Sequence, residues 1–155
     1  GRGCRGRRIP VRAMAEILLV EDSADDIELT LRAFRRFDPA RDVCVVRDGE
    51  EAIDYLLCQG RYAGREERLA PRLVLLDLNL PKLSGIEVLE RMRANDRTRL
   101  LPVVVLTTSS EPADVERCYR LGVNSYVRKP VDYGDFEDLI RQLGGYWLGL
   151  NLQPG

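Results

Sequence analysis

Residues 73–77 read Leu-Val-Leu-Leu-Asp, four apolar residues followed at once by an acid. Comparable short runs occupy residues 17–20, 43–46, 103–106 and 125–128, and segments of helical period separate them. Short runs rich in Leu and β-branched residues are typical of buried parallel strands, and short connections between strand and helix imply right-handed crossovers. We therefore predict an α/β protein with a doubly wound five-stranded parallel sheet of flavodoxin-like order 2-1-3-4-5 and helices on both faces.

The helices between these strands are expected to begin after polar capping residues. A fourth helix is predicted over Glu111–Leu121, ended by Gly122, and a fifth carries apolar residues in register as far as Trp147. The segment 59–71 is rich in Gly and Arg and is expected to be an exposed loop. The expected caps of the first three helices are Ser23 or Asp25, Asp48 and Ser84.

Acids, a hydroxyl or a lysine follow four of the five strands directly. Because the carboxyl ends of parallel strands meet at one edge of the sheet, these side chains are expected to lie together. Acids gathered in this way repel one another unless a cation joins them, and Mg²⁺ (or Mn²⁺) prefers such oxygen ligands. The pattern predicts a magnesium-assisted phosphoryl acceptor. The residues are Glu21, Asp22, Asp77, Thr107, Lys129 and Pro130.

Asp77 is the predicted nucleophile, because a carboxylate at the end of a central strand is held rigidly and can attack phosphorus in line. Glu21 and Asp22 are expected to hold the metal together with Asp77, and Asn79 to add its backbone carbonyl. Taken singly, each of these residues would be read as a helix cap or a turn residue. Their shared position at one strand edge favours the site.

Lys129 is expected to neutralise a phosphoryl oxygen, as positioned cations do in phosphoryl transfer. Pro130 after it predicts a fixed turn, for which a cis peptide bond is one form. Thr107 can donate its hydroxyl to a phosphoryl oxygen, and Tyr126 is expected to sense that movement, although an aromatic there is more often plain packing. We assign phosphoryl contact and switching to Thr107, Thr108, Tyr126, Lys129 and Pro130.

Composition excludes several other classes of protein. The chain has no histidine and its four cysteines are scattered, which excludes a Cys/His zinc site, a Ser-His-Asp triad and a histidine phosphocarrier. No glycine-rich phosphate loop follows the first strand, and no apolar stretch approaches the roughly 20 residues of a membrane span. We expect a cytoplasmic protein that binds neither membrane nor nucleic acid.

The first thirteen residues contain five arginines and no acid. We interpret residues 1–13 as a tail that is disordered or not native, preceding a natural start at Met14, with a basic arm for nucleic acid as the alternative. Residues 14–155 are expected to form a single domain, since this length suits one hydrophobic core.

The chain resembles the receiver domain of bacterial two-component response regulators, the CheY-like family, from about Glu16 to Leu148. The resemblance rests on the acid pair, on L-L-D-L-N-L-P, on the threonine thirty residues after the acceptor, and on the tyrosine and the Lys-Pro pair that follow. The segments L-V-E-D-S-x-x-D, R-D-G-E-E-A-I and V-N-S-Y-x-x-K-P-V-D resemble those of stand-alone regulators that serve phytochrome-type sensor kinases. The loop before the third strand is longer than in a minimal receiver.

The resemblance implies that Asp77 accepts a phosphoryl group from a phosphohistidine of a sensor histidine kinase, and that the protein is not an enzyme beyond slow self-catalysed phosphotransfer and autodephosphorylation. It also implies a binding surface of fourth helix, fifth strand and fifth helix that switches on phosphorylation. The partner would be the kinase, a downstream phosphotransfer protein or a second copy bound through that surface and the last apolar residues. The alternatives are a phosphate-independent interaction module and a Mg²⁺-dependent phosphatase with an Asp nucleophile.

Overall fold

Five parallel strands form one sheet in the order β2-β1-β3-β4-β5, which confirms the predicted fold class. The structure is a computed structural model, and it describes residues 16–65 and 70–154. The predicted tail, residues 1–13, lies outside the described residues. The strands are β1 (Ile17–Val20), β2 (Val43–Val46), β3 (Leu73–Leu76), β4 (Val103–Thr107) and β5 (Ser125–Arg128).

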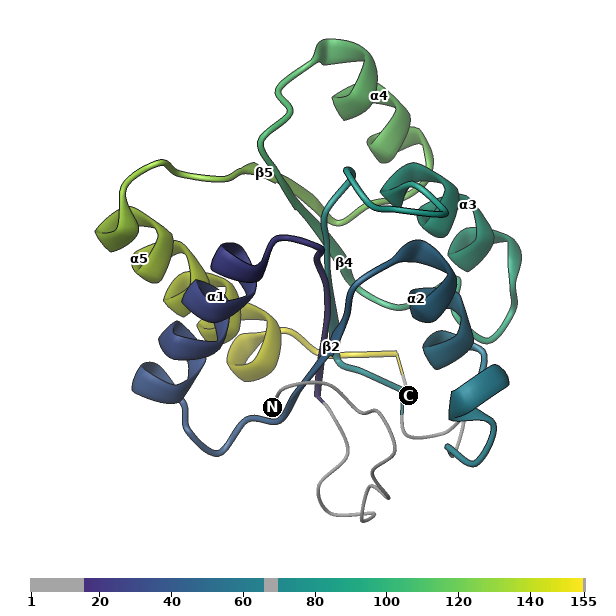
Figure 1. Cartoon of the computed structure of the whole chain (residues 1–155), viewed down its shortest axis with the longest axis horizontal. Helices are drawn as coiled ribbons and strands as arrows, with labels where there is room; N and C mark the ends of the chain where they lie inside the picture. The colour runs from purple at the N-terminus through teal and green to yellow at the C-terminus, as the bar shows by residue number, and fades with distance from the viewer. Residues whose placement is uncertain (1–15, 66–69, 155) are drawn as a thin grey trace.

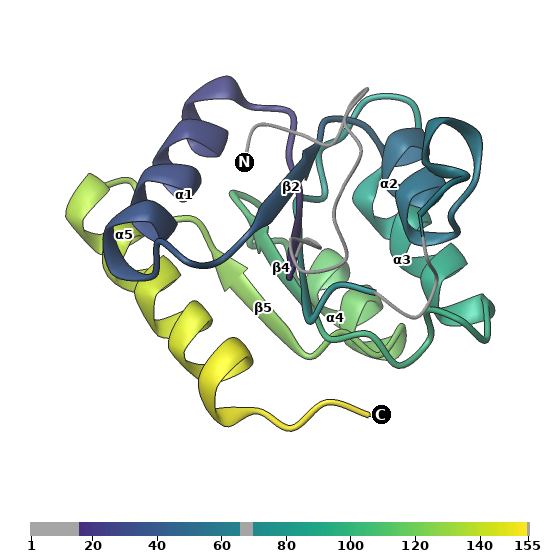
Figure 2. The same cartoon turned by 90° about the horizontal axis from the view of Figure 1, so that it is seen from below.

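Helices cover both faces of this sheet. Figure 1 shows α1 and α5 on one face and α2, α3 and α4 on the other, and Figure 2 shows the same layers from below. Strands β1 to β4 are buried along their whole length, whereas the residues of the edge strand β5 are only partly buried or exposed. The helices are α1 (Ala24–Phe37), α2 (Gly49–Leu56), α3 (Gly85–Ala94), α4 (Pro112–Arg120) and α5 (Tyr133–Gly144).

The helices begin where the capping residues predict. Ser23, rather than Asp25, caps α1, and its side chain accepts a hydrogen bond from the backbone N of Asp26. Asp48 caps α2, and Ser84 begins α3 with a reciprocal capping box. Each cap satisfies backbone donors that have no partner within the helix. The caps of α1 and α3 set where these helices begin after β1 and β3. They therefore fix the backbone on either side of the acids at the strand edge.

Two segments differ from the sequence prediction. The loop after α2 is not simply exposed, because it contains a 3₁₀ turn, η2 (Gly60–Tyr62), and the Tyr62 side chain is buried with its hydroxyl 2.7 Å from Glu51. Helix α5 ends at Gly144, before Trp147, and a π-helical turn, η4 (Gly145–Leu150), follows. Trp147 nevertheless packs against the core between the sheet and the α1–α5 face.

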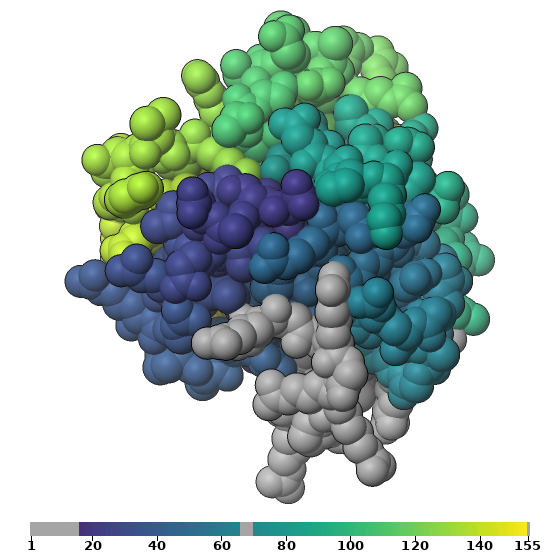
Figure 3. Space-filling model, in the orientation of Figure 1, coloured from purple at the N-terminus to yellow at the C-terminus, as the bar shows by residue number. Residues whose placement is uncertain are grey.

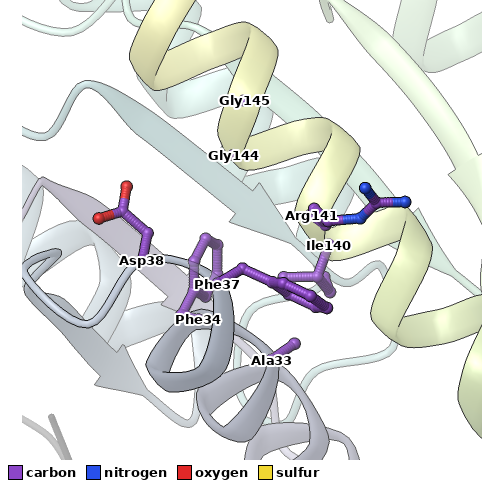
Figure 4. Close-up of a pocket in the computed structure, with 8 residues that line it drawn as sticks. All are labelled: Ala33, Phe34, Phe37, Asp38, Ile140, Arg141, Gly144 and Gly145. Atoms are coloured by element: carbon purple, nitrogen blue, oxygen red, sulfur yellow. The ribbon is translucent and has the colours of Figure 1, made fainter.

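A pocket lies between the last turns of α1 and α5 (Figure 4), and Phe34, Phe37 and Ile140 supply its apolar lining. The guanidinium of Arg141 lies 5.6 Å from the centre of the Phe37 ring, within the range of a cation–π contact. Both helices run antiparallel to the strands, so their last turns lie near the amino ends of the strands. This pocket is therefore separate from the edge where the acids lie.

None of the helices within residues 16–65 and 70–154 is long and apolar enough to cross a lipid bilayer.

Gly85, the first residue of α3, allows the helix to approach the backbone of Asp77 closely. A Cβ at this position would lie 2.2 Å from the carbonyl oxygen of Asp77 and 2.6 Å from Cα of Leu78. We expect Gly85→Ala to lower the free energy of unfolding by at least about 2 kcal/mol, because the backbone must shift. Urea denaturation measures this change.

Gly64→Ala is the matched control, because a Cβ at Gly64 meets no atom within 4 Å. We expect it to change the free energy of unfolding by less than about 0.5 kcal/mol. Equal effects of the two substitutions would contradict the close approach of α3 to Asp77.

Candidate functional site

The sheet itself positions the polar residues that follow β1, β3 and β5. The backbone N of Glu21 donates to Val46 O at 3.0 Å, and that of Asp77 donates to Val20 O at 3.0 Å. The backbone N of Lys129 donates to the carbonyl of Thr107 at 2.7 Å. The ladder thus continues one residue past each strand. The three side chains start from fixed backbone positions at the carboxyl edge, as predicted.

Lys129 joins three carboxylates at this edge. Its Nζ lies 2.5 Å from Glu21 Oε1, 2.7 Å from Asp26 Oδ2 and 3.2 Å from Asp77 Oδ2. The side chains of Lys129, Glu21 and Asp77 are at most 8% exposed, whereas that of Asp26 is 27% exposed. In Figure 3 the beginning of α1, in purple, and the segment after β3, in teal, lie side by side on the viewer's face of the molecule.

Three acids around one cation leave the site with excess negative charge. Burial, together with the hydrogen bond and the charge of Asp77, raises the pKa of Glu21 to about 7, although Lys129 acts in the opposite direction. Burial lowers the pKa of the Lys129 ammonium, but hydrogen bonds to Asp26 and Glu21 and the charges of Glu21 and Asp77 outweigh it, so that pKa lies above its usual value. Lys129 is therefore charged at neutral pH, and Glu21 is crowded by Asp77.

The oxygen atoms expected to hold a metal lie at this edge, but they are not gathered into a metal cage. Among the described residues, no group of three or more Asp, Glu or Cys side chains has the arrangement of a metal site. The Lys129 ammonium bridges Glu21 and Asp77, while Asp22 and Asn79 are exposed. Hard oxygen donors with excess negative charge suit Mg²⁺ or Mn²⁺ chemically, so the residues present fit such an ion.

Thr107 and Tyr126 both form a hydrogen bond with Ser109, in the loop after β4. The backbone N of Ser109 donates to Thr107 Oγ1 at 3.4 Å, and the Tyr126 hydroxyl donates to the Ser109 carbonyl at 2.9 Å. The Ser109 hydroxyl also donates to Asp114 in α4 at 2.7 Å. Thr107 is fully buried and Thr108 is exposed. Ser109 thus links the end of β4, the Tyr126 side chain and α4.

The chain bends just after the predicted position, at Val131 and Asp132, and the Lys129–Pro130 peptide bond is trans. The cis form considered from the sequence is therefore wrong. The Lys129 backbone is instead held in position by its hydrogen bond to Thr107.

Sequence reasoning missed Asp26 and Ser109 as parts of this edge. Asp26 is the last residue of the L-V-E-D-S-x-x-D segment, four residues after Asp22. Its spacing of about one helical turn from the acid pair was the signal that could have placed it at this edge. Ser109 had no comparable signal, since a serine in a loop after a strand is commonplace.

Comparisons with known proteins agree with this geometry. The family model of the response regulator receiver domain matches residues 17–141. The chain is 44% identical over 139 residues to the probable methanogenesis regulatory protein FilR2 of Methanothrix harundinacea, covering 90% of this chain and 87% of FilR2. It is 39% identical over 132 residues to the response regulator Rcp1 of Synechocystis, covering 85% and 88% of the two chains.

Solved structures show the same similarity. The phosphorylated cyanobacterial phytochrome response regulator RcpA matches with a TM-score of 0.85 at 37% identity, covering 92% of this chain and all of RcpA. The Mn²⁺-bound form of Rcp1 matches with a TM-score of 0.83 at 37% identity, covering 90% and 98% of the two chains.

The chain belongs to the response regulator receiver domain family. It is a receiver of two-component signalling, a class phosphorylated on aspartate, and not a classical enzyme. The alternative of a Mg²⁺-dependent phosphatase is therefore wrong. Within the family, its likeness to Rcp1 and RcpA confirms the resemblance to phytochrome-associated regulators.

Asp77→Asn should stabilise the metal-free protein at neutral pH, because it removes one of two crowded buried carboxylates and leaves Lys129 paired with Glu21. We expect the free energy of unfolding at pH 8 to rise by about 1–2 kcal/mol, about what one unit of pKa displacement represents. Urea denaturation with a chelator present measures the gain. The exposed Asp25→Asn is the control and should change stability by less than about 0.5 kcal/mol.

The gain should depend on pH. The folded state raises the pKa of Glu21 from 4.5 to about 7, so the folded state binds more protons than the unfolded state between these values. Stability therefore falls as pH rises through this window. At pH 5.5 Glu21 is mostly protonated in the folded protein and the repulsion is small. An equal gain at pH 5.5 and pH 8 would contradict crowding of Glu21 by Asp77.

Proposed function

We propose that Asp77 is the phosphoryl acceptor and that its donor is the phosphohistidine of a sensor histidine kinase. The observation that supports this most directly is the buried Asp77 carboxylate at the end of the central strand β3, between Glu21 and Lys129. A carboxylate oxygen of Asp77 forms the new bond to phosphorus. The N–P bond breaks, and its electron pair stays on the imidazole nitrogen of the donor.

The carboxylates of Glu21, Asp22 and Asp77 and the backbone carbonyl of Asn79 would hold Mg²⁺ or Mn²⁺. When bound, such an ion neutralises charge on the acids and on the phosphoryl oxygens. The donor set supports this assignment, as does the relative Rcp1, whose solved structure is a Mn²⁺-bound form. Asp22 is exposed, so its side chain can turn toward an ion at the edge.

Lys129 and Thr107 then bind the phosphoryl oxygens, with Thr108 beside them and Pro130 fixing the turn. The Thr107 hydroxyl accepts a hydrogen bond from Ser109, which leaves its proton available to a phosphoryl oxygen. Movement of Thr107 disturbs Ser109, the residue whose carbonyl holds the Tyr126 hydroxyl. We propose that Tyr126 then turns inward and changes the surface of α4, β5 and α5.

Partners of this surface follow from the same proposal. A phytochrome-type kinase is favoured because RcpA is a cyanobacterial phytochrome response regulator. Tyr119 and Tyr133 are exposed on α4 and α5. Leu150, the last residue of η4, and Leu152 after it are exposed as well, so a downstream phosphotransfer protein or a second copy has apolar groups to cover. We place this exchange in the cytoplasm, where the sensor kinase is phosphorylated.

Asp77 should be phosphorylated by acetyl phosphate in the presence of Mg²⁺, because the chemistry needs only a positioned acceptor and a cation. Phosphate-affinity electrophoresis measures the modified fraction. Asp77→Asn should show none, and a chelator should abolish the modification of the native protein. Modification that persists in Asp77→Asn would refute the assignment. A native protein that is never modified would favour the phosphate-independent interaction module.

Asp22→Ala should weaken Mg²⁺ binding roughly ten- to a hundredfold, because a hard cation loses one of its carboxylate ligands. Isothermal titration of Mg²⁺ into the native protein and the variant measures the change. Asp22 is exposed, so the fold should be unaffected. Asp25→Ala is the matched control, because it removes the same charge from an exposed position three residues later. Identical titrations for the two variants would clear Asp22 of a role at the metal.

A further inference from the structure

We propose that Asp26 is a positioning residue that competes with the phosphoryl group for the Lys129 ammonium. Phosphorylation would then break the Lys129–Asp26 pair and change the first turn of α1 as well as the α4-β5-α5 surface. This inference rests on the proposed function of Asp77. It adds a residue of α1 to the control of that site.

Lys129 is held more closely by Asp26 than by the acceptor. Its Nζ lies 2.7 Å from Asp26 Oδ2 and 3.2 Å from Asp77 Oδ2. Its second close partner is Glu21, at 2.5 Å. An ammonium has three donors, and all three are directed to carboxylates here. A phosphoryl oxygen can therefore gain a hydrogen bond from Lys129 only if one of these three acids loses it.

The backbone of Asp26 cannot follow a moving lysine. Its N donates to the hydroxyl of Ser23, the cap of α1, at 3.3 Å. Its carbonyl accepts a hydrogen bond at 2.7 Å from the hydroxyl of Thr30, which is buried under the helix. The Asp26 carboxylate is attached to this fixed backbone by a single methylene. A shift of the ammonium toward phosphorus therefore breaks the pair with Asp26 instead of stretching it.

Of the two acids that are not phosphorylated, Asp26 can lose the lysine more easily than Glu21. Its side chain is 27% exposed, against 4% for Glu21 and 8% for Asp77, so water can take the place of the ammonium. It also lies in the first turn of α1, where the helix dipole favours a negative charge. Glu21 would remain paired with Lys129, and the phosphoryl group would take the position that Asp26 leaves.

The competition can be measured with beryllofluoride, a phosphoryl mimic that binds at Asp77 in the presence of Mg²⁺. We expect Asp26→Asn to bind it about three- to tenfold more tightly than the native protein, the size of one partly exposed charge-assisted contact. Asp25→Asn is the matched control, because it removes the same charge from the same helical turn at an exposed position. It should change the affinity by less than about twofold. Fluorine NMR titration gives both affinities.

A second measurement observes the release directly. The side-chain carboxyl ¹³C signal of Asp26 should move toward that of a solvent-exposed carboxylate when beryllofluoride binds, and the signal of Asp25 should not move. In the Lys129→Met background, the Asp26 signal should already be in the released position and should stay there. This test remains valid even if Lys129→Met binds the mimic weakly.

Three results would overturn the inference while leaving Asp77 as acceptor. These are equal affinities for Asp26→Asn and Asp25→Asn, an Asp26 signal that does not respond to the mimic, and Asp26→Asn weakening Mg²⁺ binding, which would make Asp26 a metal ligand. If the native protein binds no beryllofluoride and takes up no phosphate, the proposed function itself fails, and the inference fails with it. Tighter binding in Asp26→Asn alone, with release of the Asp26 carboxyl, would support it.

Discussion

The contact of the Lys129 ammonium with buried carboxylates connects parts of the chain that are far apart in sequence. Glu21 and Lys129 are separated by two intervening strands in the sheet, and Asp77 lies between them. Removing the lysine would leave the buried carboxylates without a compensating charge, so all of them depend on it. The same contact also disfavours binding of a further anion by Lys129, since each acid that holds the lysine competes with that anion for the three ammonium protons.

The backbone positions of the site residues could be predicted from the sequence, because they depend only on where each strand ends. Each apolar run ends in a polar residue, and parallel strands place their carboxyl ends at one edge, so Asp77, Glu21 and Lys129 had to converge. The partners of each side chain could not be predicted in the same way. The contact of Lys129 with Asp26, in addition to Asp77, depends on how α1 packs beside the edge, and no local pattern encodes that packing.

The two differences between the predicted and the observed fold have separate causes. The sequence around Tyr62 is rich in Gly and Arg and predicts solvent exposure, yet the Tyr62 ring packs against Tyr55 in the core and its hydroxyl donates a hydrogen bond to Glu51 on α2. These tertiary contacts override local composition. Trp147 kept the helical period of α5, but three glycines in residues 144–149 weaken the helix, and the chain continues as a π-helical turn. Tertiary packing thus determined the first result, and local helix propensity determined the second.

The partly exposed edge strand β5 restricts how two copies of this chain can associate. An unpaired strand edge invites another strand to extend the sheet, and proteins prevent this with short strands, charges and prolines. β5 has four residues, ends in the exposed Arg128, and is followed within two residues by Pro130, which has no backbone N–H to donate. Growth of a continuous sheet across two molecules is thereby disfavoured. Any pairing of copies at this edge must rely on interlocking side chains, whose fit can change with the state of the site, and not on a backbone ladder, which would be insensitive to it.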